Sequence, residues 1–338
     1  MRMKLLEKNF IVRKTNKEWI LIMKMKNKPL NIRSIKWGII TTSLFINTLF
    51  DFTLPQSKDV VNLWLGYTVH SFREINPSDA SAAVKVYAES FKDRIAKRYQ
   101  KPAAFISTIY ESDAQVEEAF QKDQLDMLSL NTDEYFRLQR KFHIYPYLAA
   151  ATTDNPFERY VLIVRNDLKI TTPNDLKGKR LSIPNPDFNP ILNDWLYNYL
   201  INNNMPDADK VFSQIKIFDK ESNSVYEVFF KKADCTIIRE KVFTTLGELN
   251  PQLMNSLSIF ASSKPMVLTF VAANAASDQK LLSTILEEIS DFHLTASGKN
   301  ILNIFKAKKW VRVYEKDLAS VKQILDENAA SRKNAHNK

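Results

Sequence analysis

Residues 172–184, TPNDLKGKRLSIP, combine a short helical turn with the start of a strand. Pro173 stands at a helix start, where a residue without an N–H is tolerated, and Gly178 is the residue type that most easily takes the left-handed conformation ending a helix. The residues from Arg180 to Ile183 then predict a short strand. We therefore place the start of the second half of the protein at this stretch.

Length and composition predict a globular protein of about two domains. The chain has 338 residues, of which 45% are hydrophobic and 25% charged, as in ordinary globular proteins. After residue 58, strand-length apolar runs alternate with helix-length segments, which favours an α/β architecture. The expected strands are 60–67, 105–110, 124–131, 144–151, 157–165, 180–183, 215–218, 233–238, 258–260 and 267–271.

Three short motifs resemble the phosphate, phosphite and phosphonate branch of the periplasmic substrate-binding proteins that serve ABC importers. DLKGKRLSI at 175–183 is similar to the start of that family's second lobe. LDM at 125–127 is similar to its G-x-x-D-L-A strand, and residues 297–302 to its S-x-x-G-x-x-I-L helix. The resemblance covers roughly residues 59–325. It implies a two-lobed type II periplasmic-binding-protein fold, with mainly parallel sheets flanked by helices and a hinge of crossing strands.

The resemblance also implies how the chain divides. Residues 58–160 together with 258–328 are expected to form lobe 1, and residues 161–257 lobe 2. Residues 329–338 contain nothing that could bury an apolar face, so we expect a frayed tail there.

The N-terminal segment, residues 1–57, is expected to be an export leader or an N-terminal anchor. Residues 1–36 hold eleven Lys or Arg against Glu7 and Glu18, so nine of the ten net positive charges lie there and do not indicate nucleic acid binding. Residues 37–50 form an apolar run too short for a comfortable membrane span and about right for a signal-peptide core. No clear small-x-small cleavage site follows. We therefore expect a periplasmic protein, either released or tethered by this segment.

The resemblance places a ligand in the crevice between the lobes, where strand ends and helix N-termini converge. Such a place suits an anion because unpaired N–H groups and helix dipoles favour negative charge. The expected ligand-binding residues follow the strands that face this crevice: Tyr67, Thr68, His70, Asn131, Thr132, Tyr135, Asn189 and Arg239.

Two of these candidates have alternatives. An arginine at a strand end suits bidentate recognition of a carboxylate or phosphate. Arg239 could equally be a solvated helix-start residue paired with Glu240 or Asp234. His70, one of four histidines, could equally be a surface residue.

Residues 185–190, NPDFNP, depart from the pattern of phosphonate-binding relatives, which have a Ser/Thr-rich turn there. This stretch has no hydroxyl, Pro186 and Pro190 offer no N–H, and Asp187 repels an anion. Residues 131–132 likewise replace the usual Gly-Pro. We therefore expect an anionic or zwitterionic ligand other than simple phosphate or phosphonate.

No catalytic or cofactor motif is recognisable. The chain lacks G-x-S-x-G, H-E-x-x-H, a P-loop and G-x-G-x-x-G, and it has five glycines. Its single cysteine, Cys235, excludes an internal disulfide and a multi-cysteine metal cluster. We expect no enzyme activity, no cofactor and no bound metal.

The sequence therefore predicts a solute-binding protein that closes its lobes on a small ligand and delivers it to an ABC permease. Two alternatives stay open: a ligand-sensing subunit that signals to a membrane kinase or cyclase, and an enzyme on the same scaffold. The expected partners are the small molecule and a permease or membrane sensor protein. We expect a monomer that binds no nucleic acid and touches the membrane only through its leader.

Overall fold

The structure, a computed structural model, describes residues 10–15, 18–23, 60–72, 77–304 and 307–336. The chain forms two compact units, Met1–Leu54 and Pro55–Lys338. In the first, β1 (Phe10–Thr15) pairs antiparallel with β2 (Glu18–Met23). The apolar run at 37–50, expected as a signal-peptide core, lies outside the described residues. Within the described ranges, no helix has both the length and the apolar character to cross a membrane.

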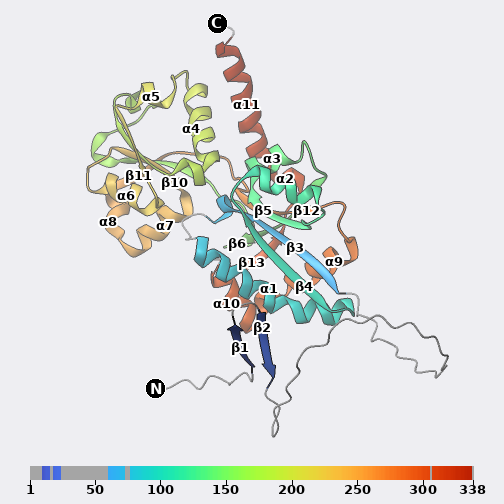
Figure 1. Cartoon of the computed structure of the whole chain (residues 1–338). Helices are drawn as coiled ribbons and strands as arrows, with labels where there is room; N and C mark the ends of the chain where they lie inside the picture. Colours follow the sequence, from blue (N-terminus) through green and yellow to red (C-terminus); the bar gives the residue numbers. More distant parts are fainter. Residues whose placement is uncertain (1–9, 16–17, 24–59, 73–76, 305–306, 337–338) are drawn as a thin grey trace, which may run out of the picture. The chain divides into compact units, whose positions relative to one another are not determined.

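The second unit contains two sheets, each flanked by helices (Figure 1). A six-stranded sheet has the order β13-β6-β12-β5-β3-β4. Its strands are β3 (Val61–Thr68), β4 (Ala103–Tyr110), β5 (Met127–Asn131), β6 (Ile144–Ala151), β12 (Thr269–Asn274) and β13 (Lys309–Arg312). The helices of this lobe are α1 (Pro77–Tyr99), α2 (Asp113–Gln121), α3 (Thr132–Leu138), α9 (Gln279–Ser290) and α10 (Ala296–Ile304).

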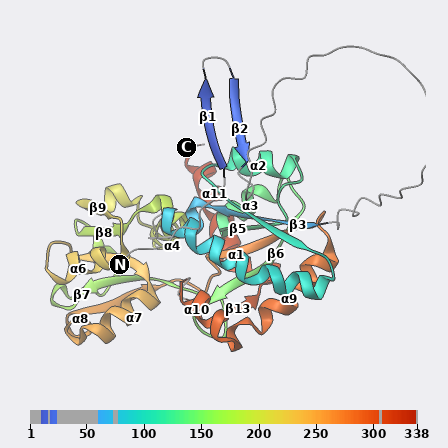
Figure 2. The ribbon, with the colours of Figure 1, turned by 60° about the horizontal axis from the view of Figure 1, so that its bottom comes forward.

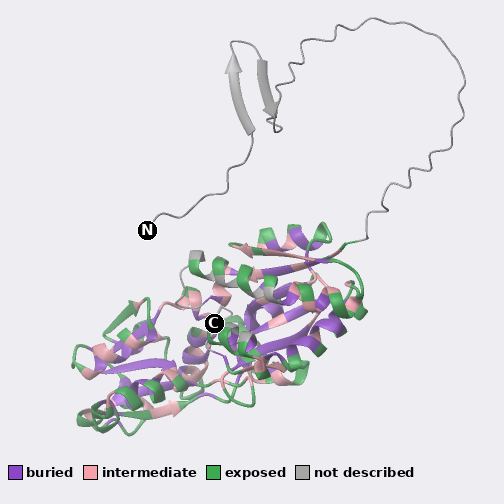
Figure 3. Ribbon diagram, turned by 90° about the horizontal axis from the view of Figure 1, so that it is seen from below, coloured by how far each residue is buried: buried purple, intermediate pink, exposed green. Residues whose placement is uncertain are grey.

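The other sheet has five strands in the order β11-β7-β10-β8-β9. They are β7 (Tyr160–Arg165), β8 (Arg180–Pro184), β9 (Gln214–Phe218), β10 (Cys235–Arg239) and β11 (Leu257–Ser262). The helices of this lobe are α4 (Pro190–Asn202), α5 (Ala208–Val211), α6 (Glu221–Phe229), α7 (Glu240–Leu249) and α8 (Pro251–Ser256). The two-lobed α/β fold is therefore as predicted (Figure 2). Buried residues lie inside both lobes (Figure 3), and one hydrophobic cluster runs from Leu130 and Phe270 of the first lobe to Leu162 of the second. Two further clusters each lie within a single lobe.

The stretch at 172–184 folds as its sequence predicts. A 3₁₀ turn, Pro173–Leu176, is closed by the Asp175 carboxylate, which accepts the backbone N–H of Thr172 at 2.7 Å. Gly178 takes a φ of 73°, the left-handed conformation that glycine adopts without strain. β8 then begins at Arg180.

Both sheets are mixed rather than mainly parallel. Within the described second unit, four strand pairings are parallel and five antiparallel. Strands joined by a helical crossover, such as β3 and β4, run parallel. β7 and β12 come directly from the other lobe, so each enters its sheet from the side of the hinge and runs against its neighbours.

The hinge consists of two crossing segments, as expected. Glu158 and Met266 form an antiparallel bridge, in which each backbone N–H donates to the other's carbonyl at 2.8 Å. The return segment begins later than the sequence suggested. β11 pairs with β7 in the five-stranded sheet, so residues 257–262 lie in the second lobe, and the division at 258 moves towards residue 263.

The C-terminal helix α11 (Ala319–His336) continues past residue 328, where a frayed tail was expected. The Asn328 side chain is buried and donates to the Asp194 backbone carbonyl at 2.9 Å. The Arg332 guanidinium lies 4.9 Å from the centre of the Tyr197 ring on α4. A frayed tail was expected because these residues cannot bury an apolar face. Polar and cation–π contacts with α4 stabilise the helix instead.

Candidate functional site

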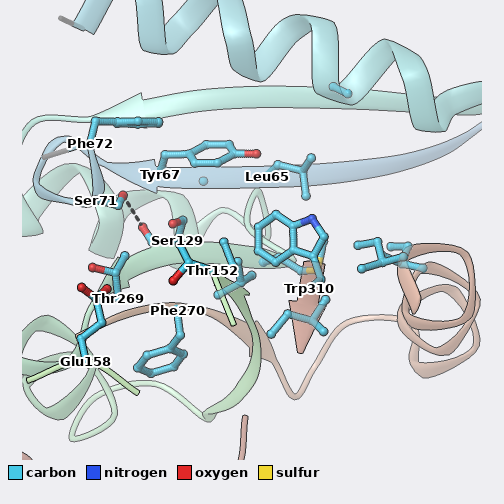
Figure 4. Close-up of a pocket in the computed structure, with 18 of the residues that line it drawn as sticks. Leu65, Tyr67, Ser71, Phe72, Ser129, Thr152, Glu158, Thr269, Phe270 and Trp310 are labelled. Atoms are coloured by element: carbon cyan, nitrogen blue, oxygen red, sulfur yellow. Dashed lines mark hydrogen bonds between the residues drawn. The ribbon is translucent and has the colours of Figure 1, made fainter. Parts of the chain in front are cut away.

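A cavity of about 590 Å³ lies between the two lobes (Figure 4). The first lobe lines it with the strands of the six-stranded sheet and with α1 and α9. The second lobe contributes Ser222, Arg239, Lys241, Val242, Thr245 and Leu246 from α6, β10 and α7. One ligand in this cavity can therefore touch both lobes.

Along four strands, the lining changes from an apolar to a hydroxyl-bearing side chain. Because alternate residues of a strand share a face, each pair points into the same cavity. The pairs are Leu65 and Tyr67 on β3, Met127 and Ser129 on β5, Ala150 and Thr152 at the end of β6, and Val271 and Thr269 on β12. The cavity thus has a hydroxyl-rich end and an apolar end.

We call the hydroxyl-rich end the polar end; it comprises Ser71, Ser129, Thr152, Glu158, Ser222, Arg239, Lys241 and Thr269. The Ser71 hydroxyl lies within hydrogen-bond distance of two backbone carbonyls, that of Thr68 at 2.6 Å and that of Ser129 at 3.1 Å. Within the described part of the chain, the hydroxyls of Ser129, Thr152 and Ser222 form no hydrogen bond. They are available to a ligand.

Arg239 lies at the polar end within a cluster of four charged groups. Its Nε donates to Glu221 Oε1 at 2.7 Å, and its Nη1 lies 3.3 Å from Glu158 Oε2. Lys241 Nζ lies 3.4 Å from the same Glu158 oxygen. Burial alone would lower the pKa of the Arg239 guanidinium, but Glu221 and Glu158 outweigh it and raise that pKa. Two cations and two carboxylates therefore balance at this end.

The partners of Arg239 differ from both sequence alternatives, Glu240 and Asp234. Asp234 instead accepts the backbone N–H and Nε of Arg180 at 2.9 and 3.0 Å, which joins β8 to β10. It also lies 3.2 Å from Arg165 Nη1. The Arg180 guanidinium beside Asp234 lowers the pKa of that carboxyl.

A buried carboxylate, Glu134, gathers three of the predicted site residues. It accepts the Thr68 hydroxyl at 2.9 Å and the Asn131 backbone N–H at 2.7 Å, and it lies 2.8 Å from His70 Nδ1. The hydrogen bond to Glu134 raises the pKa of His70, although burial opposes the shift. The cavity lining includes none of Thr68, His70 or Asn131.

His70 also meets the second lobe. Its ring contacts that of Phe188 edge-on, with the ring centres 6.2 Å apart. Phe188 belongs to the hydroxyl-poor turn at 185–190, which the cavity does not reach. The missing hydroxyls of that turn therefore do not deprive the cavity of donors.

Three further predicted residues stabilise the lobes away from the cavity. Thr132 donates its backbone N–H to the Leu268 carbonyl at 3.0 Å, and its hydroxyl to Val267. Tyr135 is fully buried and donates its hydroxyl to Glu315. Asn189 is buried at the start of α4, where its Nδ2 donates to the Asn185 carbonyl at 3.1 Å.

Of the eight predicted residues, Tyr67 and Arg239 line the cavity. Tyr67 stacks on Phe72 with ring centres 5.6 Å apart, and burial raises the pKa of its hydroxyl. Ser129, Thr152 and Thr269 also line the cavity but were not among the residues predicted from the sequence. Their signal was the strand alternation itself, in which a polar residue and an apolar one lie two positions apart on the same face.

The sequence profile of the periplasmic substrate-binding proteins of phosphonate ABC transporters matches residues 75–318. The chain belongs to this family. The resemblance in the short motifs is therefore confirmed, and the protein is a solute-binding protein with the two-lobed fold of this family. Among curated protein sequences, none matches the chain significantly.

Solved structures share the fold at low sequence identity. The binding component of a phosphonate ABC transporter from Pseudomonas aeruginosa is 13% identical, with a TM-score of 0.55, over 80% of this chain and 87% of that one. PhnD1 from Prochlorococcus marinus, solved with methylphosphonate, is 13% identical, with a TM-score of 0.55, over 79% and 97%. A Xanthomonas citri protein bound to chloride is 13% identical, with a TM-score of 0.59, over 81% and 99%. At this identity the likeness concerns the fold alone.

Proposed function

We propose that this protein captures a small ligand with an anionic group, alone or as half of a zwitterion, and delivers it to an ABC permease. The observation that carries the proposal is the polar end of the cavity. There, available hydroxyls of the first lobe share one space with Arg239 and Lys241 of the second. Hydroxyl donors and cations together suit an oxyanion.

The balance of charge at the polar end favours a ligand of low net charge. Glu158 already lies beside Arg239 and Lys241, so a strongly anionic group would meet a carboxylate as well as two cations. A zwitterion avoids this repulsion, since an ammonium group can lie near Glu158 while its anionic group accepts from Lys241 and the hydroxyls. A phosphonate that carries an amine is one such chemistry.

Capture works by closure of the lobes about the hinge. A ligand that touches Ser129 on one lobe and Lys241 on the other is bound better when the lobes are close, so it shifts the population towards the closed form. The crossing segments at Glu158 and Met266 are the connections about which such a rotation would occur. The proposed mechanism involves no covalent step and no enzyme activity.

The proposal includes the export of the protein and its state in solution. Residues 1–57 would act as a leader or an anchor that places the two lobes outside the cytoplasm, where this family works. The lobes would be residues 58–160 with 263–336, and residues 161–262. We propose that the protein acts as a monomer, because one chain supplies both faces of the cavity.

Ligand binding tests the proposal. Methylphosphonate, 2-aminoethylphosphonate, methanesulfonate and acetate are added separately to the full chain, and the melting temperature is measured; a ligand that binds only the native state must raise it. For the strongest hit, Thr152→Val is expected to weaken binding about tenfold, through the loss of one hydrogen bond to a charged group.

Thr153→Val is the matched control. This neighbouring residue is exposed, does not line the cavity and bonds the Asn155 carbonyl, so its substitution should leave affinity within about twofold. If no anion raises the melting temperature, or if both variants bind like the wild type, the proposed function is wrong.

A further inference from the structure

Beyond the polar end, the cavity continues between the six-stranded sheet and the helices that cover one of its faces. The sheet side of this extension is apolar. It is formed by Leu65 on β3, Met127 on β5, Leu148 on β6 and Val271 on β12. In the strand register Leu65 lies opposite Met127, and Leu148 lies opposite Val271. Val271 in turn lies opposite Ser129, so these two apolar pairs adjoin the polar end.

The helix side is apolar as well. Ala88, Phe91 and Ile95 recur on α1 at positions i, i+3 and i+7, which lie on one face of a helix. Ile285 and Ile289 are one turn apart on α9. We call this extension the apolar arm; it is lined by Leu63, Leu65, Ala88, Phe91, Ile95, Phe105, Met127, Leu148, Val271, Ile285, Ile289 and Trp310.

An open space of this kind is unusual in a protein interior. Cores are packed to the density of organic crystals. Most residues that line the arm belong to the same buried hydrophobic cluster as Leu282, Phe292 and Leu302, so the arm is a gap within this cluster. A largely apolar cavity offers few partners to water and can take up apolar molecules. Ala88 contributes to the space because it is the smallest side chain on the inner face of α1 among those that line the arm.

The apolar arm and the polar end form one cavity. In Figure 4, Leu65 and Trp310 lie at one side of the view and Ser71, Ser129 and Glu158 at the other, with Tyr67 between them along β3. A molecule that lies along the strands would therefore pass from hydroxyl-bearing to hydrocarbon surroundings.

We propose that the ligand of this protein is amphiphilic, with an anionic or zwitterionic head group at the polar end and an alkyl chain in the apolar arm. The inference rests on the proposed function, because it assigns the head group to the same polar end. It adds to the proposed function that the substrate is an amphiphile. A hydrophilic ligand of the same charge would leave the arm unfilled, whereas an alkyl chain buries its own surface and that of the arm.

A homologous series of ligands tests the chain directly. We would titrate methyl-, propyl-, butyl- and hexylphosphonate into the full chain by calorimetry. Each added methylene should tighten binding about fourfold until the arm is full, as expected for complete burial of that group. A series in which hexylphosphonate binds no better than methylphosphonate would overturn the inference and leave the proposed function intact. If no member binds while 2-aminoethylphosphonate raises the melting temperature, this inference is wrong and the proposed function stands; if neither binds, both are wrong.

Two variants locate the chain in the arm. Ala88→Phe fills it and should abolish the dependence of affinity on chain length. Ala82→Phe makes the same change at an exposed position of α1 and should preserve the dependence. Hexylphosphonate affinity unchanged by Ala88→Phe would contradict the proposal.

A cavity-enlarging variant keeps the test decisive if Ala88→Phe does not fold. Ile289→Ala lengthens the arm, so the gain in affinity should continue to longer chains than in the wild type. An unchanged limit would contradict the assignment of the chain to this space.

Discussion

Arg239 and Glu221, eighteen residues apart in the sequence, meet through a hydrogen bond of 2.7 Å that joins the start of α7 to the start of α6. Glu221 accepts the backbone N–H of Arg239 as well, at 3.1 Å. The two bonds fix the side of the second lobe that faces the cavity. Arg239 is therefore both a cavity residue and a structural one.

We predict that Glu221→Gln lowers the free energy of unfolding by about 3 kcal/mol, because it removes one partner of a buried ion pair. Chemical denaturation measures the change. Glu118→Gln is the control, since it removes the same charge from an exposed pair with Lys122 and should change stability little. Equal effects of the two substitutions would show that the buried pair does not stabilise the second lobe.

We predict that the contribution of His70 to stability decreases as the pH rises. The hydrogen bond to Glu134 raises the pKa of His70 above its unfolded value of about 6.5. The stabilisation is therefore complete below that value and is lost as the pH passes through the folded pKa. Chemical denaturation would be followed from about pH 5 to about pH 9 in steps of about one unit. The free energies of unfolding of the wild type and of His70→Ala should converge at high pH.

His143→Ala is the control for this pH profile, because His143 is exposed and Glu134 does not contact it. Its difference from the wild type should not vary in the same way. A His70→Ala difference that grows with pH would contradict the assigned role of Glu134.

We predict that Asp234→Asn lowers the free energy of unfolding by about 2 kcal/mol at neutral pH, because it weakens charge-assisted hydrogen bonds to Arg180 and Arg165. The pKa of Asp234 is lowered in the folded protein, so its contribution is present above the ordinary aspartate value and is lost as the pH falls through the folded pKa. The difference should vanish in acid. Asp219→Asn, an exposed change in the same lobe, should have no such effect.

We predict that Arg332→Ala lowers the free energy of unfolding by about 0.5–1 kcal/mol, because it removes the cation–π contact with Tyr197 and an exposed ion pair with Asp194. Lys333→Ala, at the next and exposed position of α11, serves as the comparison. Helix content and thermal unfolding would be recorded together. Equal stability of the two variants would mean that the last turns of α11 do not depend on α4.

The parts of the fold that local chemistry determines were predictable. The turn at Pro173, the left-handed Gly178 and the strand from Arg180 follow from neighbouring residues alone, and they form as expected. The direction of β7 and β12 was not predictable from their composition. It depends on where the chain crosses between the lobes, which no local pattern encodes.

The site was less predictable for the same reason. Ser129 and Thr152 lie on strands that become neighbours of β12 only in the folded sheet, and their surroundings change along each strand. Arg239 was singled out, yet its partners Glu158 and Glu221 come from distant segments. Thr132 and Tyr135 occupy the positions of the family motif, but their hydroxyls donate hydrogen bonds to Val267 and Glu315 and not to the cavity.

A crystal structure of the full chain with the tightest-binding alkylphosphonate tests the central proposal most directly. We predict the phosphonate oxygens within hydrogen-bond distance of Ser129, Thr152 and Lys241, and the alkyl chain against Leu65 and Ala88. A ligand bound outside this cavity, or one whose chain points to solvent, would contradict the proposal.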